Sequence, residues 1–205
     1  MHRNLLSSLI FVTTLYYSET ATALPVSAGI SIGKPLLFID LDQDTRESLG
    51  AKVSIGTDVN LFVPDYPFAI GVFYETLMLS NYGTMPINNA GIQLSYYPLG
   101  KPITVQNQSG EINIKNLGMT LYGTLGSGLT FMNIRENSGE AFVFGAAAFN
   151  LRLSTTLEYP LSDFIAAGGT LLYQTNFGGT SPEEPYPTVG ITGFSALTRL
   201  VFTIN

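Results

Sequence analysis

The sequence predicts an all-β chain that folds into an antiparallel, up-and-down β-barrel of about eight strands. In eight segments apolar residues alternate with small or polar residues, which is the two-residue period of a strand. The connections between them alternate between short, proline-containing turns and longer polar stretches. The predicted strands cover residues 26–33, 49–61, 68–78, 90–96, 117–129, 147–158, 165–174 and 194–202.

The second of these segments shows the alternation most clearly. Its odd positions, from Leu49 to Leu61, are apolar or threonine, and its even positions, from Gly50 to Asn60, are small, polar or charged. Successive side chains of a strand point to opposite faces, so these two sets line opposite faces of the sheet. The other segments repeat this pattern, residues 165–174 least regularly.

The first 23 residues have the features of a cleaved secretory signal. Arg3 supplies a basic start, residues 5–17 carry no charge, and the Ala21-x-Ala23 pair fits a signal-peptidase site. The uncharged stretch is 13 residues long, whereas a membrane-spanning helix needs about 20. We therefore expect a signal peptide at residues 1–23 and one barrel domain at residues 24–205.

The connections fall into two groups. The short ones are 63–67 and 159–163, and the long ones are about 38–48, 80–89, 132–140 and 176–188. Residues 98–116 are long where a short turn is expected. Two short apolar runs within this segment flank Asn107-Gln108-Ser109-Gly110, which predicts a small hairpin. The strand count would rise to ten if that hairpin joined the barrel.

The composition decides which face of the barrel meets the solvent. Alternation alone fits both a soluble barrel with an apolar interior and a membrane barrel with an apolar exterior. A soluble barrel needs a charged exterior, but only 12% of this chain is charged, against about 25% in an average soluble domain. The non-apolar face is mostly Gly, Ser, Thr and Ala, which suits the narrow lumen of eight strands. We therefore predict a transmembrane barrel. A secreted, lipocalin-like barrel that binds a small apolar ligand is the alternative.

The predicted signal, the eight alternating segments, the unequal connections and the aromatic last strand resemble the small eight-stranded outer-membrane barrels. The OmpA transmembrane domain and OmpX are familiar examples. The resemblance covers residues 24–205 and lies in the pattern, because no signature motif identifies a subfamily. It implies an outer-membrane location and assembly by the barrel-assembly machinery, which usually reads an aromatic residue at the end of the last strand. Here three residues follow Phe202.

Aromatic residues are predicted to form two girdles at the membrane boundaries, as in outer-membrane barrels. The short turns would face the periplasm. The residues expected at that boundary are Phe62, Tyr66, Phe68, Tyr96, Tyr159 and Phe202, and those at the other are Tyr82, Phe131, Tyr173 and Phe177.

The same alternation places several charged residues in the lumen, where unpaired charges are costly. We expect a structural polar network that closes the lumen, with Glu75 in contact with Arg152, Arg199 or Lys52. A proton or ion path, and hence a narrow channel, is the other reading. The predicted lumenal network comprises Lys52, Asp58, Glu75, Arg152, Glu158 and Arg199, with Asn60, Gln93 and Asn150 beside them.

Little in the sequence points to catalysis or to a cofactor. The chain has no cysteine, and its one histidine, His2, lies in the predicted signal, so the usual Ser–His, Cys–His and His–metal sites are absent from residues 24–205. The acidic run Asp40–Glu47 lacks the Gly and the Glu of a calcium loop. The net charge of −6 argues against nucleic acid. We expect a monomeric, non-enzymatic protein with no cofactor and no metal. Its partners would be outer-membrane lipid and lipopolysaccharide, and its role structural or one of surface interaction through its long loops.

Overall fold

The computed structural model describes residues 24–42, 45–49, 51–63, 66–79, 86–108, 111–116, 118–134, 144–179 and 189–204. The predicted signal peptide, residues 1–23, lies outside these ranges. In the described part, no helix is long and apolar enough to cross a membrane.

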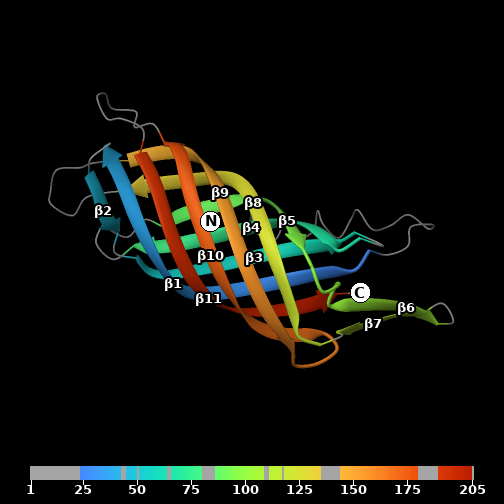
Figure 1. Ribbon diagram of the computed structural model, residues 1–205. Helices are drawn as coiled ribbons and strands as arrows, with labels where there is room; N and C mark the ends of the chain where they lie inside the picture. Colours follow the sequence, from blue (N-terminus) through green and yellow to red (C-terminus); the bar gives the residue numbers. More distant parts are fainter. Residues whose placement is uncertain are drawn as a thin grey trace, which may run out of the picture.

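Eight of the described strands form a closed antiparallel barrel, which confirms the predicted fold class (Figure 1). Their order around the barrel is β11-β10-β9-β8-β5-β4-β3-β1, and the pairing of β11 with β1 closes it. Each predicted strand has its counterpart, in most cases a longer one. The barrel strands are β1 (Val26–Asp42), β3 (Ala51–Phe62), β4 (Phe68–Leu79), β5 (Ile87–Tyr96), β8 (Thr120–Ile134), β9 (Phe144–Pro160), β10 (Ile165–Gly179) and β11 (Val189–Ile204).

The two ends of the barrel differ, and we name them by their connections. The turn end holds the paired strand termini Val26 and Ile204 and the short β3–β4 and β9–β10 connections. The loop end holds the longer β4–β5, β8–β9 and β10–β11 connections. At the loop end β1 runs on to Asp42, and β2 (Thr45–Leu49) pairs back against it. The prediction of a loop across 38–48 is therefore wrong, because most of this segment is a strand extension.

The hairpin predicted within 98–116 is present. It consists of β6 (Ile103–Gln108) and β7 (Glu111–Asn116), which pair with each other as a separate two-stranded sheet. Figure 1 shows it projecting beyond the turn end, near the C-terminus. Neither strand pairs with a barrel strand, so the barrel keeps eight strands.

The apolar rows face outward. Leu171, Ile92 and Phe194 are 70%, 65% and 57% exposed, whereas Ser54, Asn89 and Thr130 on the opposite face are fully buried. Burial of apolar area is the main favourable term in folding, so a surface of this kind needs an apolar solvent. This orientation contradicts the lipocalin-like alternative, in which the apolar rows would enclose the ligand.

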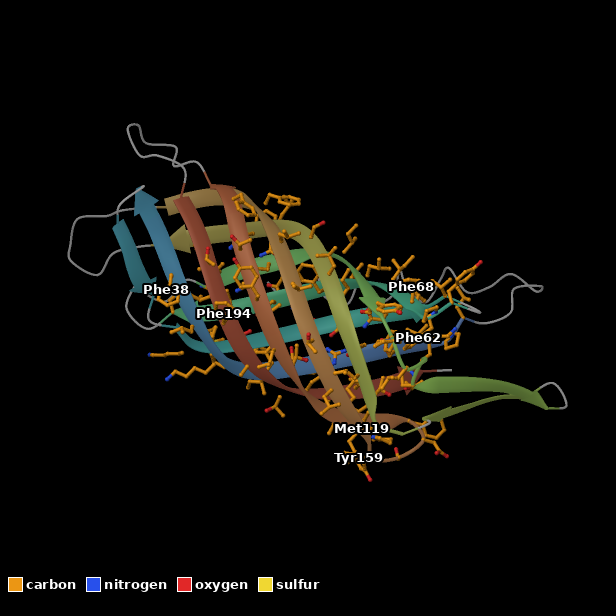
Figure 2. The ribbon with its side chains drawn as sticks, in the orientation of Figure 1. Phe38, Phe62, Phe68, Met119, Tyr159 and Phe194 are labelled. Atoms are coloured by element: carbon orange, nitrogen blue, oxygen red, sulfur yellow. The ribbon has the colours of Figure 1, made fainter. Side chains whose placement is uncertain are left out.

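Aromatic side chains lie toward both ends of the outer surface. Figure 2 shows Phe38 and Phe194 toward the loop end, and Phe68 and Tyr159 toward the turn end. Of the predicted girdle residues, Tyr82 lies outside the described residues. Phe62 is a correction, because it is buried inside the barrel and not at its surface. The remaining predicted girdle residues, Tyr66, Phe68, Tyr96, Phe131, Tyr159, Tyr173, Phe177 and Phe202, are exposed or half-buried.

Candidate functional site

The lumen is bridged from wall to wall by one arginine and two carboxylates. Arg199 of β11 donates from Nε to Glu158 Oε1 of β9 at 2.9 Å, and from Nη2 to Asp58 Oδ2 of β3 at 2.8 Å. Its Nη1 donates to Asp58 Oδ1, so the contact with Asp58 is bidentate. Strands β3 and β9 lie four places apart in either direction around the barrel. The ion pairs therefore join opposite walls.

A glycine makes room for this arginine. Gly29 faces the lumen on β1, next to β11, and a Cβ atom at that position would overlap the Arg199 guanidinium. The small residues of the lumenal face therefore do more than fill the narrow lumen. They leave space for the few long side chains that cross the lumen.

Neutral hydrogen-bonding groups extend the bridge to two more strands. Tyr122 of β8 donates its hydroxyl to Glu158 Oε1 at 2.6 Å, and Asn60 Nδ2 donates to Asp58 Oδ2 at 2.5 Å. Gln93 of β5 donates from Nε2 to Asn60 Oδ1 at 2.9 Å. Each carboxylate thus accepts from Arg199 and from a neutral donor. We call Asp58, Asn60, Gln93, Tyr122, Glu158 and Arg199 the lumenal network.

Glu75 lies in a different cluster, which corrects its predicted contact with Arg199 or Lys52. It is 1% exposed, and it accepts from Ser54 Oγ at 2.6 Å and from Asn89 Nδ2 at 3.1 Å. Thr130 Oγ1 donates to Asn89 Oδ1 at 2.6 Å. None of the ion pairs among the described residues includes Glu75. Arg199 is held by Asp58 and Glu158, so Glu75 accepts its hydrogen bonds from uncharged groups, and the positive charge of Arg152 also acts on it.

The remaining predicted basic residues do not join the lumenal network by an ion pair. Arg152 lies in the lumen, with its guanidinium carbon 4.2 Å from the centroid of the Phe73 ring, which is a cation–π contact. Lys52 is exposed, so its predicted lumenal position is wrong. The β3–β4 register shifts between Ala51 and Val53, and this bulge takes Lys52 out of the regular alternation.

Another group of buried amides and a hydroxyl lies on β9, β10 and β11. Asn150 Nδ2 donates to Asn176 Oδ1. Within the protein, Asn150 Oδ1, Gln174 Nε2, Asn176 Nδ2 and Ser195 Oγ have no hydrogen-bond partner. Buried polar atoms of this kind are normally satisfied by ordered water.

Aromatic side chains fill the turn end of the lumen. The rings of Phe62 and Tyr97 lie 5.5 Å apart and those of Tyr97 and Tyr122 lie 4.7 Å apart, with Ala69 beside them. Tyr97 follows the last residue of β5, and burial raises the pKa of its phenol, which therefore stays protonated. Lys101 Nζ donates to the carbonyl of Val63 at 2.7 Å and ties the start of the hairpin connection to the β3–β4 turn.

Two cavities among the described residues of the lumen are small. A cavity of about 30 Å³ lies among Asp58, Gln93, Arg152, Ser154 and Thr170. A second, of about 10 Å³, lies among Phe62, Tyr97, Pro102 and Tyr122. A water molecule needs roughly 10–15 Å³ of such volume, so the first cavity holds about two or three waters and the second at most one. Among the described residues, no group of three His, Cys, Asp or Glu residues is placed to hold a metal ion.

The alternation predicted which residues face inward, but not all of the residues that close the lumen. Phe62 and Phe73 follow the inward parity of Asp58 and Glu75 on their own strands, and Tyr122 follows that of Thr124. This parity is the signal that identifies them. The girdle prediction overrode this parity only for Phe62, which lies at the end of its strand.

Solved structures share this architecture. The chain is similar to the Neisserial surface protein A, with 11% identity and a TM-score of 0.50 over 88% of this chain and 98% of that one. It is similar to the N-terminal β-barrel domain of Pseudomonas aeruginosa OprF, with 12% identity and a TM-score of 0.51 over 87% and 97%. It is also similar to the outer membrane protein AlkL, with 11% identity and a TM-score of 0.51 over 93% and 95%. No protein-family model and no curated protein matches the sequence. The chain therefore has the fold of the small outer-membrane β-barrels.

Proposed function

We propose that the protein is a non-catalytic, monomeric, integral barrel of the outer membrane that acts at its surface, through the connections at its loop end. The observation that carries this proposal is the closed lumen. Arg199 bridges Asp58 and Glu158 on opposite walls, and aromatic side chains fill the lumen at the turn end. A barrel whose interior is closed contacts other molecules through its outer surface and its connections.

The pairing of the lumenal charges also supports a structural role. Asp58, Glu158 and Arg199 engage each other, and the cavities beside them have no room for a substrate. A general acid or base has to reach a reacting group. In this lumen the carboxylates of Asp58 and Glu158 accept hydrogen bonds from other members of the lumenal network.

The surface proposal is tested by a pair of epitope insertions in the full-length protein, expressed in a Gram-negative host. One epitope is placed between Pro182 and Glu183, in the β10–β11 connection, and the control epitope between Ser109 and Gly110, in the β6–β7 connection. We expect antibody to label the first on intact cells. The second should be labelled only after the outer membrane is permeabilised. The reverse pattern would contradict the proposal.

The narrow channel is the competing function, and it makes a different prediction. The purified, refolded barrel in planar lipid bilayers should show no stable single-channel conductance, because the ion-paired bridge crosses the lumen and the cavities beside it among the described residues hold only a few waters. A steady conductance level that disappears after heat denaturation of the same sample would favour the channel and overturn the closed-lumen proposal.

A further inference from the structure

Three of the described strands have a hydrogen-bonded neighbour on one side only. They are β2 at the loop end, and β6 and β7, which form the hairpin at the turn end. Every other described strand pairs on both sides, because the pairing of β11 with β1 closes the barrel. A one-sided strand presents unpaired N–H and C=O groups along its free edge, and such an edge can accept an added strand. These three edges are therefore candidate contact surfaces.

The free edge of β6 lacks the features that normally protect an edge strand. Natural edges are blunted by charged residues, lysine above all, or by proline. β2 contains Arg46 and Glu47, and β7 contains Glu111 and Lys115. β6 has the sequence Ile-Thr-Val-Gln-Asn-Gln, which contains neither a charge nor a proline and begins with three β-branched residues that favour strands. Of the three edges, that of β6 is therefore the most suited to pair with another chain.

The register of the hairpin also places its apolar residues on one face. Val105 pairs with Ile114, and Ile103 and Ile112 lie two positions away from them along their own strands, so the four positions share one face of the two-stranded sheet. The positions of the opposite face hold Thr, Gln, Asn, Glu and Lys. Two strands alone are marginally stable in water, and a third strand with a shared hydrophobic face stabilises them. A strand with apolar residues at alternate positions would extend this face.

The connection to the barrel fixes the start of the hairpin. Lys101 Nζ donates to the carbonyl of Val63 at 2.7 Å, and the amide of Tyr97 donates to the carbonyl of Pro67 at 2.9 Å. Gly100, with a φ of 94°, donates its amide to the carbonyl of Tyr97. The other two turn-end connections, β3–β4 and β9–β10, show that a short turn is enough to join barrel strands. Figure 1 shows β6 and β7 projecting beyond the turn end, and neither pairs with a described barrel strand.

We propose that the free edge of β6 is a docking site for an extended segment of a periplasmic protein, which adds as a third, antiparallel strand with apolar residues at alternate positions. The edge itself determines this class of partner, because its unpaired N–H and C=O groups are satisfied by an extended main chain. In this mode of recognition main-chain hydrogen bonds give affinity and alternate side chains give selectivity. The inference goes beyond the proposed function, which concerns the loop end. It rests on that function only for the compartment, because a loop end at the cell surface places the turn end in the periplasm.

The test measures binding of a fluorescent peptide, Arg-Thr-Val-Thr-Val-Thr-Glu, to the refolded full-length barrel in neutral detergent micelles. Two further peptides carry N-methyl groups, one on both valines and the other on the first two threonines, so each loses N–H donors from a different edge of its strand. One methylated peptide should bind about tenfold more weakly than the other, the effect of losing one or two net hydrogen bonds. The two have the same composition, so they partition equally into micelles. A barrel with residues 103–116 replaced by a short Gly-Ser turn should bind none of the three above the level of empty micelles.

Single cysteines identify the edge that is used. The chain has no cysteine, and Gln106 of β6 pairs with Asn113 of β7. The probe is the same peptide with cysteine in place of its middle threonine, in a glutathione buffer. Gln106→Cys should form the mixed disulfide about tenfold faster than Asn113→Cys, because neighbouring strands lie about 4.8 Å apart and position 113 is one strand further from the added peptide.

Three outcomes would overturn the inference. One is equal binding of the two methylated peptides by the wild type, a result that does not depend on the folding of any variant. Another is a faster disulfide at position 113, which would assign the contact to β7. The third is self-association of the wild type that the hairpin replacement abolishes, which would assign the edge to a second copy of this chain. A micelle has no inner and outer side, so reversed epitope labelling would remove the proposed function and leave peptide binding intact. Failure of peptide binding would remove the inference alone.

Discussion

Replacing Arg199 with methionine tests whether the lumenal network holds the barrel together. Methionine keeps most of the side-chain length but removes the bidentate contact with Asp58 and the hydrogen bond to Glu158. Two carboxylates that are less than a tenth exposed then lose their positive partner. Breaking a buried ion pair from one side costs about 3–5 kcal/mol. That is a large part of a typical folding stability of roughly 5–15 kcal/mol.

The same change at Arg152 is the matched control. Arg152 also lies in the lumen, and its charge acts on those of Glu75 and Asp58, but its guanidinium packs on the Phe73 ring and forms none of the ion pairs among the described residues. Arg152→Met should therefore cost about 1–2 kcal/mol, the range of a desolvated cation–π contact. In the Arg199→Met background, Asp58→Asn with Glu158→Gln should restore at least half of the loss, because the lumenal network then holds no charged residue.

The chain has no tryptophan, so unfolding by urea in lipid vesicles is best followed by the mobility shift of the unboiled barrel in electrophoresis. Stability is obtained from the urea midpoint and slope. Equal midpoints for Arg199→Met and Arg152→Met would refute the reasoning, because they would mean that the ion pairs contribute no more than the ring contact.

Three further predictions use the same assay. Gly91→Ala should destabilise the barrel by about 1–3 kcal/mol, because the added Cβ would overlap the backbone of the neighbouring strand, whereas Gly123→Ala, whose nearest such atom is 3.8 Å away, should be close to neutral. Tyr122→Phe should cost about 1.5–3 kcal/mol, since it removes the 2.6 Å hydrogen bond to the Glu158 carboxylate, and a change below 0.5 kcal/mol, roughly the level of surface substitutions, would speak against that bond. Replacing residues 103–116 with a short Gly-Ser turn should leave the barrel's urea midpoint unchanged, because β6 and β7 pair only with each other, and a lowered midpoint would mean that the hairpin supports the barrel.

The alternation in the sequence predicted the closed barrel and its two faces because a strand has a fixed period and a membrane barrel has no free edge. It placed Asp58, Glu158 and Arg199 in the lumen, where the structure brings them together. Parity gives the face of a residue but not its height along the barrel. For that reason it could not decide that Arg199 pairs with Asp58 and Glu158 and not with Glu75, a choice that depends on the register of strands distant in sequence.

Lys52 shows a second limit. One bulge between Ala51 and Val53 breaks the two-residue period, so parity counted from Asp58 fails at this residue. A bulge has no clear sequence signal here. The extension of β1 and its pairing with β2 are not predictable from the sequence for another reason. Acidic residues such as Asp40 and Asp42 are depleted in strands, so their presence favours a loop.

The central claim is the outward orientation of the apolar rows, and spin labels along β9 test it most directly. The chain has no cysteine, so single cysteines at positions 151–157 can each carry one nitroxide. In lipid vesicles, oxygen should collide most with labels at 151, 153, 155 and 157, whose side chains are exposed, and least at the buried positions 154 and 156. The opposite phase, or fast collision of a water-soluble nickel complex at the odd positions, would contradict the claim.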